Sequence, residues 1–89
     1  MQHVRCVDEQ GAVLAGMRVR MRAIPFGAGA LDVVATSGAD GIAAFAAPTP
    51  GKYVVTASGN GWTDGRRPSD AIHQLPSAPF DVRLEEFWV

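Results

Sequence analysis

Glycine and proline interrupt this chain so often that a long helix has no room to form. The sequence holds ten glycines and six prolines among 89 residues. No long window keeps apolar residues at helical spacing without one of them intruding. Strand-like runs instead recur at short intervals, separated by turn signals such as Asp40-Gly41 and the Pro48–Gly51 break. These features predict an all-β chain.

The segment 17–24 gives the clearest strand pattern, because apolar and basic side chains alternate along it. Successive side chains of a strand point to opposite faces of the sheet. The apolar set, which should face the core, is Val19, Met21 and Ala23. The basic set, which should face solvent, is Arg18, Arg20 and Arg22. This segment is therefore expected to lie in a sheet with one buried and one exposed face.

Similar patterns predict the other strands. They are expected at residues 2–8, 31–37, 42–47, 52–59 and 79–87, with a further short strand left open around Ile72 in the polar connection 63–78. The shared parity of these strands predicts a core centred on Val19, Phe45, Tyr53, Val55, Val82 and Leu84. The expected fold is a single domain, residues 1–89, forming a small antiparallel β-sandwich of six or seven strands.

Two stretches carry a resemblance to a known class of domain. "VDEQGAVLAGMRVRM" and "TSGADGIAAFAAPTPGKYVVTASGNGW" resemble the two halves of carboxypeptidase-regulatory-like and transthyretin-like (Ig-like) β-sandwich domains. The resemblance covers residues 4–62, with Val13 where those domains usually have proline, and residues 63–89 match no motif of the class. It implies the same sandwich architecture, and such modules are attached to many unrelated proteins.

Charge and hydropathy give few hints about partners or location. The formal net charge of −1 provides no general attraction to nucleic acid or to an anionic membrane. The N-terminal sequence lacks the basic and apolar regions of a signal peptide, and the run "IAAFAA" is too short to span a bilayer. The expected location is a virion, or the cytoplasm before assembly.

No residue pattern in the chain predicts catalysis, a cofactor or a metal. Enzymes of transthyretin-like architecture need clusters of Tyr, His or Arg, whereas this chain has one tyrosine, Tyr53, which fits the core better. His3 and His73 would bind a metal only with a carboxylate such as Asp70, and two unrelated histidines are the simpler interpretation. Cys6, the sole cysteine, lies on an apolar strand face and is expected to be buried and inert.

Two features could bind a partner. The row of Arg18, Arg20 and Arg22 is either a solvated face, paired with Asp32, Asp81 or Glu85, or a surface for an acidic protein, which fits the charge balance better than nucleic acid. The C-terminal residues Phe87, Trp88 and Val89 either close one end of the core or anchor a neighbouring chain through Trp88.

These observations predict a non-enzymatic structural and interaction module. The preferred role is a small phage virion component, either a capsid decoration (cement) protein or a tail accessory protein, with neighbouring copies or a larger assembly as partner. The alternative is a carbohydrate- or surface-binding module related to domains of secreted enzymes. Sugar binding would need a flat platform of exposed aromatic rings, for which Trp62 and Trp88 are the only tryptophans.

Overall fold

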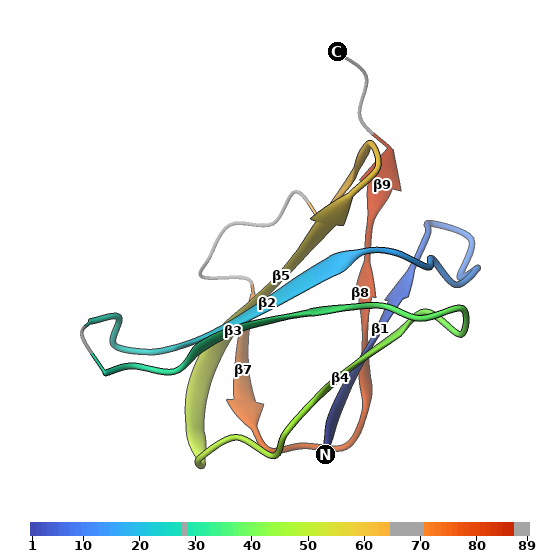
Figure 1. Ribbon diagram of the computed structural model, residues 1–89. Coiled ribbons are helices and arrows are strands. Elements are labelled where there is room, and N and C mark those ends of the chain that lie inside the picture. The colour runs from blue at the N-terminus through green and yellow to red at the C-terminus, as the bar shows by residue number, and fades with distance from the viewer. Residues whose placement is uncertain (28, 65–70, 87–89) are drawn as a thin grey trace.

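The computed structural model describes residues 1–27, 29–64 and 71–86, and these residues form strands and turns without a helix (Figure 1). The described residues form nine strands in this order: β1 (Gln2–Val7), β2 (Arg18–Ala23), β3 (Asp32–Thr36), β4 (Ile42–Phe45), β5 (Gly51–Gly59), β6 (Trp62–Thr63), β7 (Ile72–Leu75), β8 (Phe80–Arg83) and β9 (Glu85–Glu86).

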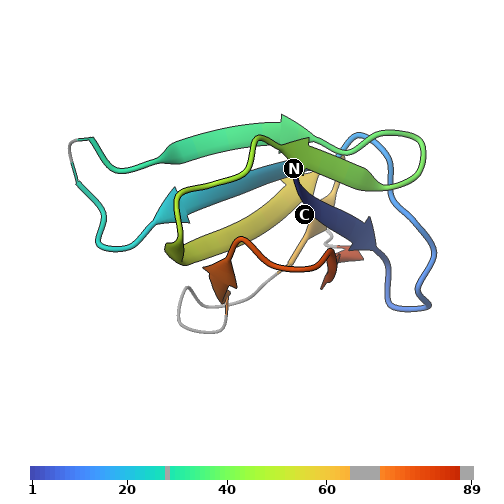
Figure 2. The same ribbon diagram turned by 90° about the horizontal axis from the view of Figure 1, so that it is seen from below.

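The strands form two sheets that enclose one core. The smaller sheet has the order β4-β1-β8, and the larger one has the order β3-β2-β5-β6-β9, with β7 also paired to β5. Every pairing is antiparallel except that of β1 with β8, which is parallel. The all-β fold is thus confirmed, and the two sheets are compatible with the small sandwich expected from the sequence (Figures 1 and 2).

The strand count exceeds the expected six or seven for two local reasons. The strand expected at residues 79–87 is divided at Leu84, so that β8 pairs with β1 in one sheet and β9 pairs with β6 in the other. The chain after Gly59 also folds back through a tight turn and pairs Trp62 with Gly59, which creates β6. The strand left open around Ile72 is present as β7.

The alternation in β2 divides its side chains as the sequence predicts. Val19 and Met21 are fully buried, and Ala23 packs partly buried against the core. Arg18 and Arg20 are exposed on the opposite face, with Arg22 half-buried beside them. β2 lies between β3 and β5 in the larger sheet, so both of its edges are paired.

The core contains all six residues that strand parity predicts. It is the cluster Val4, Cys6, Met17, Val19, Met21, Ala43, Phe45, Tyr53, Val55, Ala57, Leu75, Val82 and Leu84. The predicted core did not include Met17, which shares the parity of Val19 and precedes β2, or Leu75, which lies in the strand left open around Ile72. Burial of these apolar side chains supplies the main driving force for folding.

Two buried polar side chains tie distant parts of the chain together. The Ser37 hydroxyl accepts a hydrogen bond from the Met17 amide (2.9 Å) and donates one to the Leu14 carbonyl (2.8 Å). The Gln2 side-chain carbonyl accepts a hydrogen bond of 2.8 Å from the Ser77 amide. Both side chains are therefore satisfied inside the fold, as buried polar groups must be.

Short turns reverse the chain between successive strands. Gly41 has a φ of +79°, and the Asp40 carboxylate accepts a hydrogen bond from the Ile42 amide (2.9 Å), so Asp40-Gly41 reverses the chain between β3 and β4 as expected. At the next corner the Tyr53 hydroxyl donates a hydrogen bond of 2.6 Å to the Thr49 carbonyl. Tyr53 is thus a core residue that also holds the proline-rich corner.

Candidate functional site

The three arginines of β2 lie on the outer face of the larger sheet, where one carboxylate from β3 joins them. The Arg20 guanidinium grips Asp32 with two hydrogen bonds, from Nε to Oδ1 (2.8 Å) and from Nη2 to Oδ2 (2.6 Å). Arg22 Nε lies 3.7 Å from the same carboxylate. The hydrogen bond from Arg20, with the charges of both arginines, holds the pKa of Asp32 below its ordinary value.

The expected partners of this row are only partly right. Asp32 pairs with Arg20 and Arg22, because β3 neighbours β2 in the sheet. Asp81 does not reach the row, because β8 belongs to the smaller sheet and Asp81 pairs with Arg5 there. Glu85 lies in β9 at the far edge of the larger sheet, with β5 and β6 between it and β2.

Arg18 is the exposed member of this row that remains available. Within the described part of the chain it takes part in no ion pair, whereas its two neighbours share Asp32. A shallow hollow of about 290 Å³ lies beside it, lined by Arg18, Arg20, Val34, Thr56 and Ser58. We call this set of residues, with Arg22 and Asp32, the arginine face. Its cations exceed its carboxylates by two, so it attracts acidic groups.

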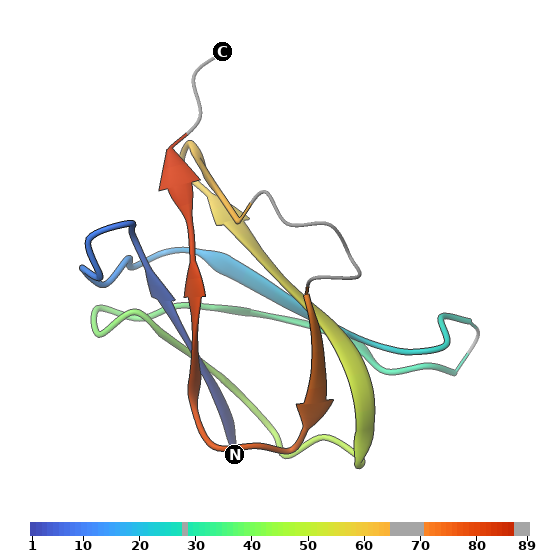
Figure 3. The same cartoon turned by 180° about the vertical axis from the view of Figure 1, so that it is seen from behind.

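The β2–β3 hairpin projects beyond the rest of the fold, as all three ribbon views show (Figures 1, 2 and 3). Its described projecting residues are 24–27 and 29–31, and the sequence "IPFGAGAL" to which they belong has no charged side chain. Ile24, Phe26 and Leu31 are exposed there, with half of the Phe26 surface open to solvent. We call these three residues the hairpin tip.

Arg22 joins the hairpin tip to the arginine face. Its guanidinium carbon lies 4.0 Å from the centroid of the Phe26 ring, a cation–π contact, while its Nε approaches Asp32. Charged and apolar groups thus meet on one continuous surface. The sequence patterns assigned no functional role to residues 24–31, so the hairpin tip was missed. The available signal was a run of eight residues without a polar side chain between two charged strands.

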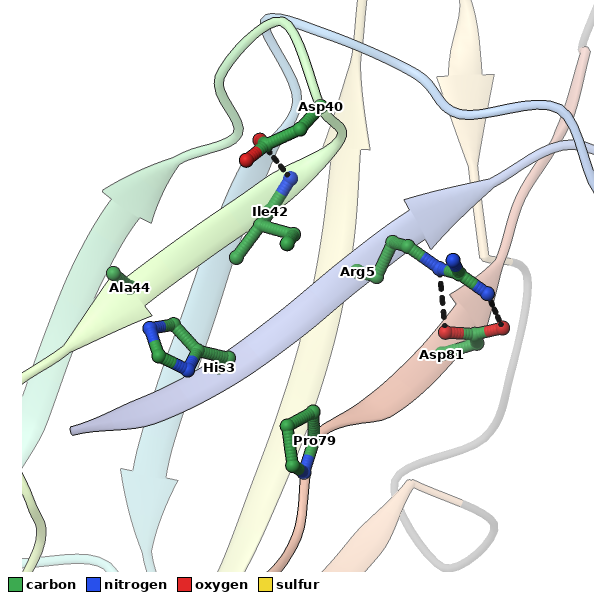
Figure 4. Close-up of a pocket in the computed structure, with 7 residues that line it drawn as sticks. All are labelled: His3, Arg5, Asp40, Ile42, Ala44, Pro79 and Asp81. Atoms are coloured by element: carbon green, nitrogen blue, oxygen red, sulfur yellow. Dashed lines mark hydrogen bonds and ion pairs between the residues drawn. The ribbon is translucent and has the colours of Figure 1, made fainter.

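A second concave surface lies on the outer face of the smaller sheet (Figure 4). This groove has a volume of about 490 Å³, and strands β1, β4 and β8 contribute most of its lining: His3, Arg5, Asp40, Ile42, Ala44, Pro79 and Asp81. The small side chain of Ala44 lies opposite His3 in the strand register and leaves the hollow between them. The groove is therefore built on regular strands rather than on loops.

The ionic groups of the groove are occupied by neighbouring protein groups. Arg5 donates two hydrogen bonds to Asp81, from Nε to Oδ1 (2.9 Å) and from Nη2 to Oδ2 (2.8 Å). These bonds hold the pKa of Asp81 below its ordinary value and raise that of Arg5. Asp40 already caps its own turn. The groove thus offers a partner a half-buried imidazole and an apolar floor, flanked by one satisfied ion pair.

The candidate metal ligands do not meet. His3 lies on the outer face of the smaller sheet, whereas His73 points inward from β7 in the larger sheet and stacks on Phe80 with ring centroids 4.1 Å apart. Among the described residues no group of three or more His, Cys, Asp and Glu side chains is placed to hold a metal ion. Asp70, the carboxylate considered with them, lies outside the described residues.

Cys6, the next-to-last residue of β1, is buried, as expected. Burial raises the pKa of its thiol to about 11, and this effect exceeds the opposing influence of the nearby Ser37 hydroxyl. At neutral pH the sulfur is therefore protonated and weakly nucleophilic. This residue acts as a small apolar side chain of the core.

The predicted C-terminal anchor, Phe87, Trp88 and Val89, lies outside the described residues. Trp62, considered as part of a sugar-binding platform, packs half-buried against the core. Phe26 is the one Phe, Tyr or Trp ring of the described residues that is exposed, and Arg22 lies over it.

Comparisons with protein-family models, with curated proteins and with solved structures gave no match for this chain. The resemblance to carboxypeptidase-regulatory-like and transthyretin-like domains therefore stays a prediction. The described residues contain no helix with the length and apolar character that crossing a bilayer requires.

Proposed function

We propose that this chain is a non-enzymatic structural module that attaches to a larger protein assembly through the hairpin tip and the arginine face. The observation that carries the proposal is the contact of Arg22 with both Phe26 and Asp32, which unites an exposed apolar tip with a basic sheet face. Aromatic and arginine side chains are the types most enriched where protein interfaces gain their affinity.

The shape of the hairpin also favours a protein partner. A projecting segment that carries only apolar side chains loses an unfavourable contact with water when it enters a pocket of another protein. The Arg20–Asp32 ion pair keeps the neighbouring sheet face ordered, and Arg18 is left to meet a carboxylate of the partner. An acidic surface with an apolar hollow is the expected complement.

The proposed assembly is a virion, in which the chain would serve as a capsid decoration or tail accessory protein. This part of the proposal rests on the sequence resemblance to small Ig-like modules. The alternative, a carbohydrate-binding module, has less support in the described residues, because Phe26 is their one exposed Phe, Tyr or Trp ring and Arg22 lies over one of its faces, so no flat platform of several rings forms.

Sedimentation of the tagged chain from its source cells tests the proposal. We expect the chain to travel with a large particle whose nucleic acid resists nuclease, as packaged genomes do. The double variant Phe26→Ser/Leu31→Ser should lose at least about 90% of this association while its melting temperature stays near that of the wild type.

Val13→Ser is the matched control, because Val13 is similarly exposed but lies in the β1–β2 connection, away from the hairpin. It should sediment like the wild type. A wild-type chain that remains at the top of the gradient would contradict attachment to an assembly. A particle without protected nucleic acid would contradict the virion and leave the attachment itself supported.

A further inference from the structure

β3 forms an open edge of the larger sheet. The strand order ends at β3, which pairs with β2 on one side and with no strand of the described residues on the other. In Figure 2 it lies outermost, along the upper margin of the fold. A strand in this position presents unpaired backbone groups that can bind a further strand.

The register identifies which backbone groups are open. Hydrogen bonds from Ala23 N to Leu31 O and from Ser37 N to Met17 O bracket the β2–β3 pairing. Hydrogen-bonded positions alternate along an antiparallel pair, so Val33 and Ala35 also bond to β2. The N–H and C=O groups of three residues consequently face away from β2: Asp32, Val34 and Thr36.

No strand of the described residues pairs with this edge, although β4 of the smaller sheet lies near one end of β3, across the turn at residues 37–41. A groove of about 340 Å³, lined by apolar residues that include Leu31, Val34 and Ala47, runs beside it. Natural edge strands are usually protected by lysine, proline or a bulge. β3 has the sequence DVVAT, and its one charged group, Asp32, is already bound by Arg20. The Val34 side chain is 48% exposed.

We propose that β3 pairs antiparallel with β3 of a second copy of this chain, about a two-fold axis through Val34. The three open positions are symmetric about Val34, so each Val34 would lie opposite its counterpart and Asp32 opposite Thr36 of the second copy. Six backbone hydrogen bonds would form in this register, and the two half-exposed Val34 side chains would cover one another. An edge that is complementary to itself has a second copy as its simplest partner.

Charge placement supports the same register. Arg18 lies beside Thr36 in the sheet, and Thr36 would lie beside Asp32 of the second copy. Arg18 has no ion pair within the described residues. In this register it would lie two strands, about 10 Å, from the Asp32 carboxylate of the second copy, and the two opposite charges would attract each other. Asp32 and Val34 belong both to this edge and to the arginine face, but the dimer can be tested separately from the proposed function, because it would form in the purified protein without any other partner.

Cysteine cross-linking tests the register. Directly opposite residues of a hydrogen-bonded antiparallel pair have Cα atoms about 5.5 Å apart, which a disulfide can span. Val34→Cys should therefore cross-link quickly to a second copy under mild oxidation. Thr36→Cys is the matched control, because its counterpart would lie four residues away, at about 14 Å. Cys6 is buried and should not compete.

Reversible association is tested by sedimentation velocity of the purified chain up to about 1 mM, since so small an interface gives a weak dimer. Val34→Pro should weaken dimerisation at least tenfold and leave the fold intact, because the N–H that it removes faces away from β2. Val34→Thr, which keeps that N–H, should dimerise like the wild type. A wild type that is monomeric throughout, equal cross-linking of the two cysteine variants, or an unaffected proline variant would each overturn the proposal.

Discussion

The backbone of Gly41 passes so close to Val13 that a Cβ atom added at position 41 would lie 2.8 Å from the Val13 Cβ and 2.9 Å from the Cys6 carbonyl oxygen. Two turns of the chain, one after β1 and one before β4, thus meet without space for a methyl group. This contact fixes the end of the smaller sheet, because the Cys6 amide donates a hydrogen bond of 2.7 Å to the Gly41 carbonyl.

Gly41→Ala should therefore destabilise the protein by about 2–5 kcal/mol, through both the left-handed φ and the steric clash. Gly11→Ala is the matched control, since Gly11 has a similar φ of +84° with open space around it. Gly11→Ala should lower the free energy of unfolding only through the unfavourable left-handed φ, by about 1–2 kcal/mol. Urea unfolding of both variants measures the difference, and equal losses would show that the close approach has no effect.

Phe45→Ala should cost about 3–5 kcal/mol, because it empties a large site in the core. Phe45 is 4% exposed and packs inward from β4. Phe26→Ala makes the same chemical change at a ring that is half exposed, and it should cost less than about 1 kcal/mol. Thermal and urea unfolding of the two variants provide the measurement. A loss below about 1 kcal/mol for Phe45→Ala would contradict the core assignment.

The Arg5–Asp81 ion pair predicts a specific acid dependence of stability. The arginine lowers the pKa of folded Asp81 below its ordinary value of 3.8. The carboxylate therefore stabilises the fold above pH 3.8, and this contribution is lost as the pH falls through the lower pKa of the folded state.

The difference in melting temperature between the wild type and Asp81→Asn should accordingly be present near pH 7 and disappear at strongly acidic pH. Both side chains are about half exposed, so about 1 M salt should reduce the difference. A difference that stays constant between pH 7 and pH 2 would show that Asp81 acts through packing alone.

The thiol of Cys6 should be protected in the folded protein. Since burial raises its pKa to about 11, iodoacetamide at pH 8 should alkylate the native chain about 100-fold or more slowly than the urea-unfolded chain. The neutral thiol also makes stability fall as the pH rises from the ordinary value of 9.0 through 11. Rapid alkylation under native conditions would mean that β1 opens locally.

The sequence predicts this fold best where the alternation of apolar and polar residues within a single strand identifies its buried face. Alternation in β2 correctly separates Val19 and Met21 from the arginines, and the Asp40-Gly41 turn follows from the known tolerance of glycine for positive φ. The Arg20–Asp32 ion pair could also be predicted from the sequence, because a hairpin places β2 beside β3.

Relationships between distant segments could not be predicted in the same way. Arg5 and Asp81 are 76 residues apart and meet through a parallel pairing, for which no turn fixes the partner or the register. The hairpin tip was missed because local patterns show that a loop is apolar without showing whether it folds back or projects. The contact of Gly41 with Val13 likewise depends on how two separate turns approach each other.

The position of β1 between β4 and β8 has a consequence for the synthesis of the chain. β1 leaves the ribosome before the other strands of this domain, and β4 can pair with it once about 40 further residues have been made. Its other edge stays open until residues 80–83 emerge. Throughout that interval the nascent chain exposes the unpaired edge of β1 and the apolar face that β1 later buries. Exposed edges and apolar faces of this kind aggregate, so this is the stage at which chaperones protect the chain most.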